Sequence, residues 1–112
     1  MAPFNAFHTF GEDGTFVETS DLLVTGTEGP AHGVWMGEKP EFLLTFELFA
    51  FDPERKEAVG IVRVRNAITL SADNNSFTSR YVVDFIAPDG TVESGIDTGG
   101  YSATRVKVMS VK

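Results

Sequence analysis

Apolar and polar residues alternate along most of this chain, and the alternation predicts β-strands rather than helices. Segments rich in Phe, Val, Ile and Thr with a period of two residues lie between short polar clusters. No stretch of about 11 residues keeps the i, i+3, i+4, i+7 apolar stripe of a helix free of Gly or Pro. The pattern predicts eight strands: Phe4–Phe10, Thr15–Ser20, Gly33–Gly37, Glu41–Phe51, Ala58–Leu70, Ser76–Ala87, Thr91–Ile96 and Ser102–Val111.

Turn-forming residues separate these strands at regular intervals. Gly11-Glu12-Asp13-Gly14, Ala72-Asp73-Asn74-Asn75, Pro88-Asp89-Gly90 and Gly99-Gly100 are four such clusters. Short, evenly spaced antiparallel strands are typical of barrels and sandwiches. Closure into a barrel would also remove the unpaired edges of so Phe-rich a sheet. We therefore expect an all-β fold, an antiparallel up-and-down barrel of about eight strands, formed by residues 1–112 as a single domain.

Two hairpins predict the same inner face. If Leu70 lies opposite Phe77, then Val64 faces Val83, Val62 faces Phe85 and Asn66 faces Tyr81. The preceding hairpin adds Leu44, Phe46 and Leu48 to that apolar side. On the other face, Glu47, Arg63 and Asp84 align across three strands. Such a triple can resemble a catalytic constellation, but a solvated cross-strand charge ladder explains it better.

Composition and charge exclude several classes of function. The 112 residues include 9 Lys and Arg against 16 Asp and Glu, a net charge of -7, and contain no Cys. The sparse basic residues predict no nucleic-acid or membrane partner, and the lack of Cys excludes disulfides, zinc–thiolate sites and a cysteine nucleophile. The N-terminal residues lack the features of a signal peptide, so we expect a cytoplasmic protein.

His8 and Glu18 form the first candidate site. A three-residue loop Glu12-Asp13-Gly14, with Gly14 at positive φ, would place these two side chains opposite each other beside Phe10 and Phe16. A carboxylate beside an imidazole can orient it as a general base. An outward-facing polar pair is the plainer interpretation, and a four-residue loop would separate the two residues.

Asn66 and Tyr81 form the second candidate site, on the expected inner face with Phe46 and Phe85. Asp97 reaches Tyr81 if Pro88-Asp89-Gly90 is the loop and pairing continues past Gly95. Such groups could bind a carbonyl or hydroxyl of a ligand. A structural hydrogen-bond network around a buried tyrosine is an equal alternative.

His32 and Trp35 follow a Gly- and Pro-rich segment, and we expect Trp35 to close one barrel end and His32 to cap a loop or line the site. Two His without a His-x-x-x-His spacing do not predict a zinc site. Neither a Gly-x-Ser-x-Gly elbow nor a phosphate-binding Gly-rich motif is present. We therefore expect no metal and no cofactor.

Several of these segments resemble small calycin-like (lipocalin-like) β-barrel proteins, most of them without an established function. The similarity lies in residues 13–20, in Pro30-Ala31-His32-Gly33-Val34-Trp35, in the strand ending at Phe51-Asp52 and in Pro88–Val92, and so covers nearly the whole chain. The family's usual additional first strand with Gly-x-Trp is missing. This departure makes Phe4–Phe10 a candidate for pairing with another subunit, and we expect a homodimer.

Three functional hypotheses follow from the residues and the resemblance. The first is a barrel that binds a small hydrophobic molecule in its cavity. The second is a cofactor-free cyclase or isomerase with His8, Glu18 and Tyr81 as catalytic groups. In both, ligand contacts would come from the inner-face and loop residues His32, Trp35, Phe46, Asn66, Phe85 and Asp97. The third is a filled barrel that serves as an interaction module, because eight strands enclose either packed side chains or one small ligand.

Overall fold

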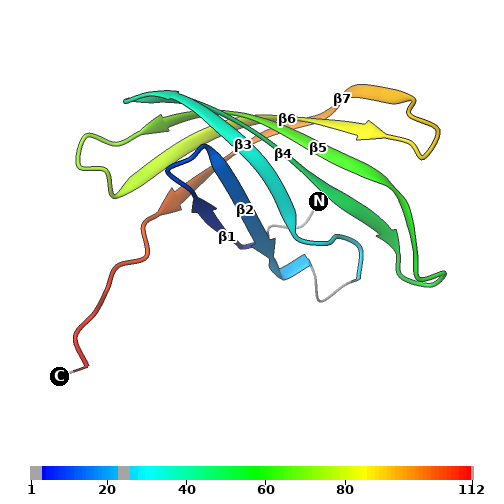
Figure 1. The fold of residues 1–112 in the computed structure, drawn as a ribbon, viewed down its shortest axis with the longest axis horizontal. Helices are drawn as coiled ribbons and strands as arrows, with labels where there is room; N and C mark the ends of the chain where they lie inside the picture. The colour runs from blue at the N-terminus through cyan, green and yellow to red at the C-terminus, as the bar shows by residue number, and fades with distance from the viewer. Residues whose placement is uncertain (1–3, 23–25, 112) are drawn as a thin grey trace.

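The chain forms one antiparallel sheet that curls into a half-barrel. The computed structural model describes residues 4–22 and 26–111. The seven strands follow one another in chain order across the sheet (Figure 1). They are β1 (Ala6–Phe10), β2 (Thr15–Ser20), β3 (Ala31–Glu38), β4 (Glu41–Asp52), β5 (Glu57–Leu70), β6 (Ser76–Ile86) and β7 (Val92–Thr104). The predicted antiparallel up-and-down all-β architecture is confirmed.

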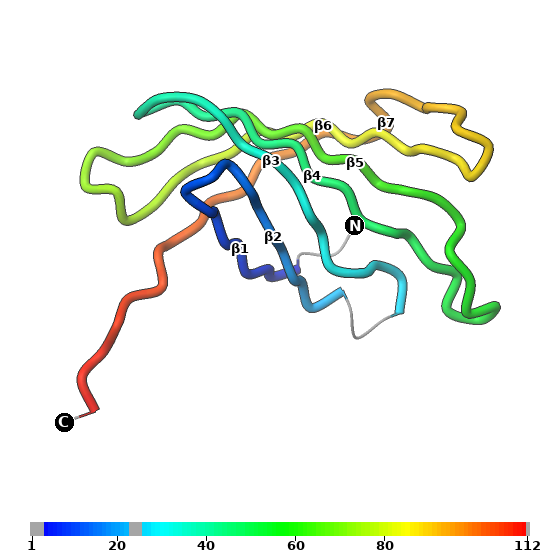
Figure 2. Tube along the Cα trace, viewed as in Figure 1, coloured from blue at the N-terminus to red at the C-terminus, as the bar shows by residue number. Residues whose placement is uncertain are grey.

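The strand count and the chain end differ from the sequence-based expectation. Residues predicted as a seventh strand and the start of an eighth are one continuous strand, β7, that passes through Gly99 and Gly100. Residues 105–111 lie outside any strand and extend away from the sheet (Figure 2). Among the described strands β1 and β7 are edges that do not pair with each other, so hydrogen bonding does not close the barrel.

The buried apolar core lies on the concave side of the sheet. It consists of Phe16, Ala31, Leu44, Phe46, Leu48 and Ile68. Gly33 lies between Phe16 and Phe46 in the strand register, and a Cβ there would lie 2.7 Å from the Cβ of Phe46. The missing side chain lets the two phenyl rings stack with centroids 5.3 Å apart. The predicted inner face is therefore the face that the fold buries.

Both central hairpins have the predicted register. Leu70 pairs with Phe77, Asn66 with Tyr81 and Arg63 with Asp84. Glu47 pairs with Arg63 across β4 and β5, because a bulge beside Ala50 absorbs the extra residue near the loop. The apolar pattern alone determined this pairing, since a slip by one residue would have exposed the whole core.

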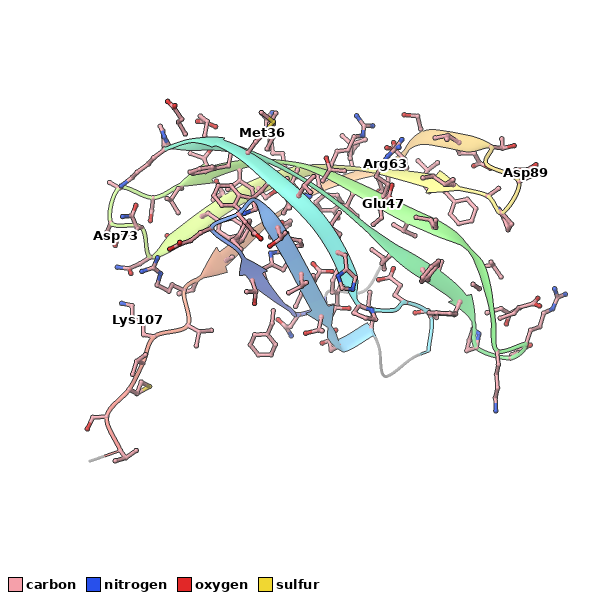
Figure 3. The ribbon with its side chains drawn as sticks, in the orientation of Figure 1. Met36, Glu47, Arg63, Asp73, Asp89 and Lys107 are labelled. Carbon is pink, nitrogen blue, oxygen red and sulfur yellow. The ribbon has the colours of Figure 1, made fainter. Side chains whose placement is uncertain are left out.

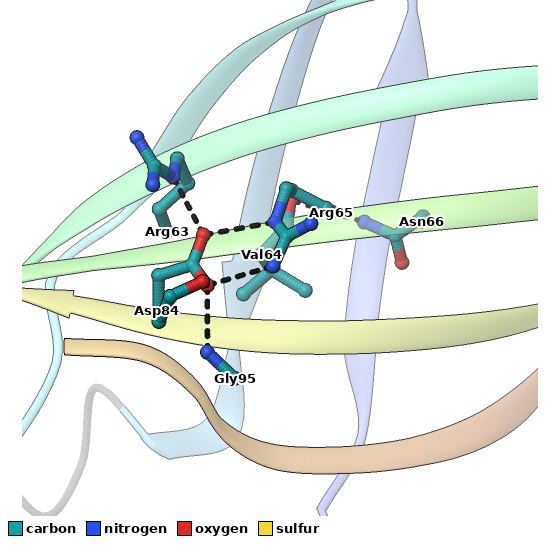
Figure 4. A network of polar contacts seen from close by, with 7 residues as sticks. Arg63, Val64, Arg65, Asn66, Asp84 and Gly95 are labelled. Carbon is teal, nitrogen blue, oxygen red and sulfur yellow. Dashed lines mark hydrogen bonds and ion pairs between the residues drawn. The ribbon is translucent and has the colours of Figure 1, made fainter.

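A carboxylate is fully covered on the convex side. Asp84 has a side-chain exposure of 0%, and Figure 4 shows how Arg63, Arg65 and Gly95 surround it. Its Oδ2 accepts from Arg63 Nε at 2.8 Å and from Arg65 Nε at 2.9 Å, and its Oδ1 accepts from Arg65 Nη2 at 2.8 Å. The Gly95 amide and the Ser94 hydroxyl also donate to Oδ1, at 2.9 and 3.1 Å. These groups hold the pKa of Asp84 well below its usual range, with the Arg65 hydrogen bonds as the largest cause.

The structure thus differs from the expected three-residue charge ladder, because Arg63 and Arg65 both bind Asp84. We call these three residues, with Ser94 and Gly95, the Asp84 clamp. No ion pair within the described residues joins Glu47 to Arg63, although the two are register partners. Figure 3 shows Glu47 and Arg63 on neighbouring strands, with Met36 projecting from the convex side. The clamp also fixes the bulge in β7, because two of its donors, Ser94 and Gly95, belong to that bulge.

Replacement of Asp84 should make the fold less stable in a pH-dependent manner. Because the folded state lowers the pKa of Asp84 below 3.8, its stabilisation is complete above that pH and is lost as the pH falls further. We expect Asp84→Asn to lower the melting temperature by several degrees at pH 7, with a smaller difference at pH 3. Thermal unfolding followed by circular dichroism measures this, with Glu47→Gln as the control that leaves the melting temperature unchanged. Equal effects of the two variants would contradict the clamp.

Candidate functional site

The His8–Glu18 pair forms as predicted on the concave side. Gly14, at φ 87°, completes the three-residue loop between β1 and β2. Asp13 Oδ1 accepts hydrogen bonds from the amide and hydroxyl of Thr15, which fixes that loop. His8 and Glu18 are therefore register partners, and His8 Nε2 lies 2.6 Å from Glu18 Oε2. Their side chains are only 12% and 11% exposed, so the plainer interpretation of an outward-facing pair is wrong.

Aromatic rings surround the imidazole of His8. The nearest ring centroids are those of Phe16 at 5.0 Å and Tyr101 at 5.6 Å. The phenyl rings of Phe10, Phe46 and Phe77 follow, each at 6.3 Å. With Nε2 donating to the carboxylate, Nδ1 of a neutral ring is an acceptor. This atom is buried and has no hydrogen-bond partner among the described residues.

Asn66 lies at the centre of a buried polar network beside the ring cluster. Its Oδ1 accepts hydrogen bonds from the hydroxyls of Tyr101 at 2.9 Å and Ser79 at 3.2 Å. Its Nδ2 donates to the carbonyls of Leu44 and Val64, both at 3.3 Å. The amide is fully satisfied, so the network stabilises the sheet and leaves no group of Asn66 for a ligand.

Tyr101, rather than Tyr81, is the hydroxyl partner of Asn66. Burial is the largest cause that raises the pKa of Tyr101 to about 12, and the negative charge of Glu18 contributes to this shift. The sequence pattern does not predict this contact, because Gly99-Gly100 is typical of a turn and a turn there would place Tyr101 in a separate strand. The signal was present: Tyr101 is two residues beyond Gly99, on the face that Tyr81 shares.

The predicted contact between Asp97 and Tyr81 is wrong. A bulge between Val83 and Phe85 shifts the β6–β7 register by two residues, so Asp97 pairs with Val83 and Tyr81 pairs with Gly99. The Tyr81 ring lies directly over Gly99, where a Cβ would be 2.5 Å from its hydroxyl oxygen. Asp97 is exposed near the β7 edge and accepts a hydrogen bond from the Thr98 amide. The sequence did not predict the bulge because its cause, the Asp84 clamp, joins residues from three strands.

Glu28 is an acidic neighbour of Glu18 that the sequence analysis did not identify. Glu28 forms an isolated bridge with Ala50 and is half-buried. Burial is the largest cause that raises the pKa of Glu28, and the negative charge of Glu18 is the second. No strand pattern identifies Glu28, because it lies in the β2–β3 connection, outside the named strands.

The remaining predicted ligand residues lie in different places. His32 is exposed on the convex side between Val17 and Glu47 in the register. Trp35 lies on the concave side under the β1–β2 turn, where its Nε1 donates to the Gly11 carbonyl at 2.9 Å. Phe46 belongs to the ring cluster, and Phe85 is half-buried farther along the same face. His32 is therefore separated from the other candidates by the thickness of the sheet.

Two hollows of the surface lie away from these residues. One, of about 510 Å³, is lined by Asn5, Ala6, Phe7, Thr19, Ser20 and Asp21. The other, of about 340 Å³, lies where β4, β5 and β6 end, beside Phe49 and Ile61. Both are open to solvent, and neither is lined by a predicted site residue. The ring cluster around His8 is packed, since five aromatic ring centroids lie 5.0–6.3 Å from its imidazole.

Neither a group of metal-ligating side chains nor a membrane-spanning helix is present among the described residues. Within residues 4–22 and 26–111, no group of three or more His, Asp and Glu side chains is placed to hold a metal ion. In the same part of the chain, no helix is long and apolar enough to cross a membrane. Among the described residues, His8 Nδ1 is a buried side-chain atom without a hydrogen-bond partner.

Replacement of Tyr101 should show that it belongs to the buried network. Tyr101→Phe removes the hydrogen bond to Asn66 and should lower the free energy of unfolding by about 1 kcal/mol. In the parent protein, the folded state raises the Tyr101 pKa from 10.0 to about 12, so stability should fall as the pH rises from 10.0 toward 12. Ultraviolet absorbance titration should show a late-ionising tyrosine that Tyr101→Phe removes. Tyr81→Phe is the control, and loss of the late transition in that variant would contradict the assignment.

The chain matches no family model, and the comparisons with curated proteins and with solved structures find no match either.

Proposed function

We propose that the concave side of the half-barrel binds a small, mostly apolar molecule. The observation that carries the proposal is a group of half-buried residues beyond the ring cluster. We call this group the open concave face; it consists of Val62, Val64, Tyr81, Val83 and Phe85. The β1–β2 hairpin contributes His8, Phe10 and Phe16 to the ring cluster, whereas the side chains of the open concave face keep part of their surface exposed. Apolar surface on a curved sheet is a favourable place for a ligand of similar shape.

Polar groups beside this face would orient such a ligand. Tyr81 belongs to the open concave face itself and would present its hydroxyl group to a ligand bound there. Glu28 and the His8–Glu18 pair add acidic and imidazole groups on the same side of the sheet. A few polar groups on an otherwise apolar surface are typical of small-molecule sites. The ligand class that fits is an apolar ring or chain with one hydrogen-bonding group.

The enzyme alternative rests on the geometry of His8. Its Nε2 contacts the Glu18 carboxylate while its Nδ1 has no partner among the described residues, an arrangement that suits a cofactor-free general base. Proton transfer in a cyclase or isomerase would require a substrate atom to reach Nδ1 through the surrounding rings. The filled interaction module is favoured by the packing of those rings and predicts no binding at the open concave face.

Binding can be tested with the neutral fluorophore N-phenyl-1-naphthylamine. We expect its fluorescence to rise with the parent protein, and Val83→Lys to weaken its binding about tenfold or more because the change places a charge on the apolar face. Val34→Lys is the matched control, since Val34 is exposed on the convex side of the sheet. Equal binding by both variants, or no binding by the parent protein, would overturn the proposal.

A second experiment separates binding from catalysis. The protein is incubated with a cell extract, re-isolated, and the retained small molecules are identified by mass spectrometry. We expect a compound that is retained unchanged, and less of it with His8→Ala or Glu18→Ala because both remove the polar pair beside the face. A converted compound with the parent protein and an unconverted one with His8→Ala would support the cyclase or isomerase instead.

A further inference from the structure

We infer that the chain beyond β7 pairs with the β7 edge of a second copy, so that β7 and its extension form a symmetric dimer interface. Residues 105–111 continue the β6–β7 ladder for one residue, since the Arg105 amide donates to the Asn75 carbonyl at 2.8 Å. Beyond Arg105 no residue of β6 is left to pair with, because β6 begins at Ser76, and the chain overhangs the sheet (Figures 1 and 3).

The overhanging segment has the sequence of a strand and leaves its apolar side chains in water. Val106, Val108, Met109 and Val111 are all exposed, and Val108 and Val111 completely so. The sequence Arg105-Val106-Lys107-Val108 alternates charged and β-branched residues, which is a pattern typical of strands. Four exposed apolar side chains on one short segment favour association with another surface.

The β7 edge is long enough to pair with another strand, and its acidic residues complement the basic residues of the segment 105–111. On one side β7 pairs with β6. On its other side no described strand forms a backbone ladder with any of its 13 residues, although the His8 ring of β1 lies against Tyr101. Glu93 and Asp97 are exposed on β7, whereas residues 105–111 contain Arg105 and Lys107 and no carboxylate. The whole chain has a net charge of -7, whereas this segment has a net positive charge. Acidic residues on an edge strand repel another acidic edge but attract a basic strand.

A two-fold axis at Ser102 that relates the two copies of the chain would bring the basic segment of each copy beside the acidic β7 edge of the other. Antiparallel pairing of β7 with its symmetry mate about this residue places Lys107 opposite Asp97 and Val108 opposite Ile96 of the other copy, twice by symmetry. The pairing ends where the bulge around Gly95 begins. The β1 edge fits less well, because β1 has only five residues and its flanking turn carries Glu12 and Asp13.

Charge exchange tests the pairing through the dissociation constant of the dimer, measured by light scattering and sedimentation. Lys107→Glu and Asp97→Lys should each weaken the dimer about tenfold, because each creates a like-charge pair twice. The combined variant restores opposite charges and should dimerise nearly as well as the parent protein. Lys56→Glu, in the β4–β5 turn, is the control and should have no effect. A parent protein that is monomeric at millimolar concentration, or a combined variant weaker than both single ones, would overturn the inference.

Disulfide formation tests the symmetry axis independently, since the chain contains no Cys. Under mild oxidation Ser102→Cys should form a covalent dimer, because the two copies of this residue lie opposite each other at the axis. Thr9→Cys, exposed on β1, should remain monomeric under denaturing electrophoresis. The reverse result would assign the interface to β1 and would contradict pairing through β7. Neither outcome depends on a ligand, so the inference can fail without affecting the proposed binding function.

Discussion

The structure depends on one constraint: a single sheet without a second layer must cover its own apolar face. The chain meets this constraint by curling until side chains of β1 contact those of β6 and β7. His8 lies against Tyr101, and Phe10 lies against Phe77 with ring centroids 6.0 Å apart, although the two edge strands form no ladder with each other. Closure is therefore made by aromatic rings rather than by backbone hydrogen bonds. Such ring pairs stabilise a fold beyond the apolar area that they bury.

The same closure explains the chemistry of the concave side. Where β1 and β2 cover the sheet, polar groups lose water and must find partners, so Glu18 contacts His8 and Asn66 accepts from Tyr101 and Ser79. Burial raises the pKa of Tyr101 and of Glu28 for this reason. Where the hairpin does not reach, the open concave face keeps apolar surface in contact with solvent. The proposed binding function and the packed ring cluster are thus two results of one partial closure.

Contacts on the convex side of the sheet hold the long edge strand β7 in place. The Asp84 clamp gathers donors from β5 and from the β7 bulge, and it fixes where β7 shifts its register. That shift places Gly99 beneath Tyr81 and Tyr101 beside Asn66. A charged cluster on one face therefore positions an aromatic network on the other.

The sequence by itself determined the strand order, the inner face and the close approach of His8 to Glu18. Each follows from local rules: alternation with a period of two, loop lengths, and the positive φ at Gly14. Only the tertiary structure decided that Tyr101 replaces Tyr81 beside Asn66, that Asp97 lies opposite Val83, and that Glu28 approaches Glu18. The physical reason is that these outcomes depend on a bulge and a curl. Both are set by contacts among residues distant in the chain, and no local pattern encodes them.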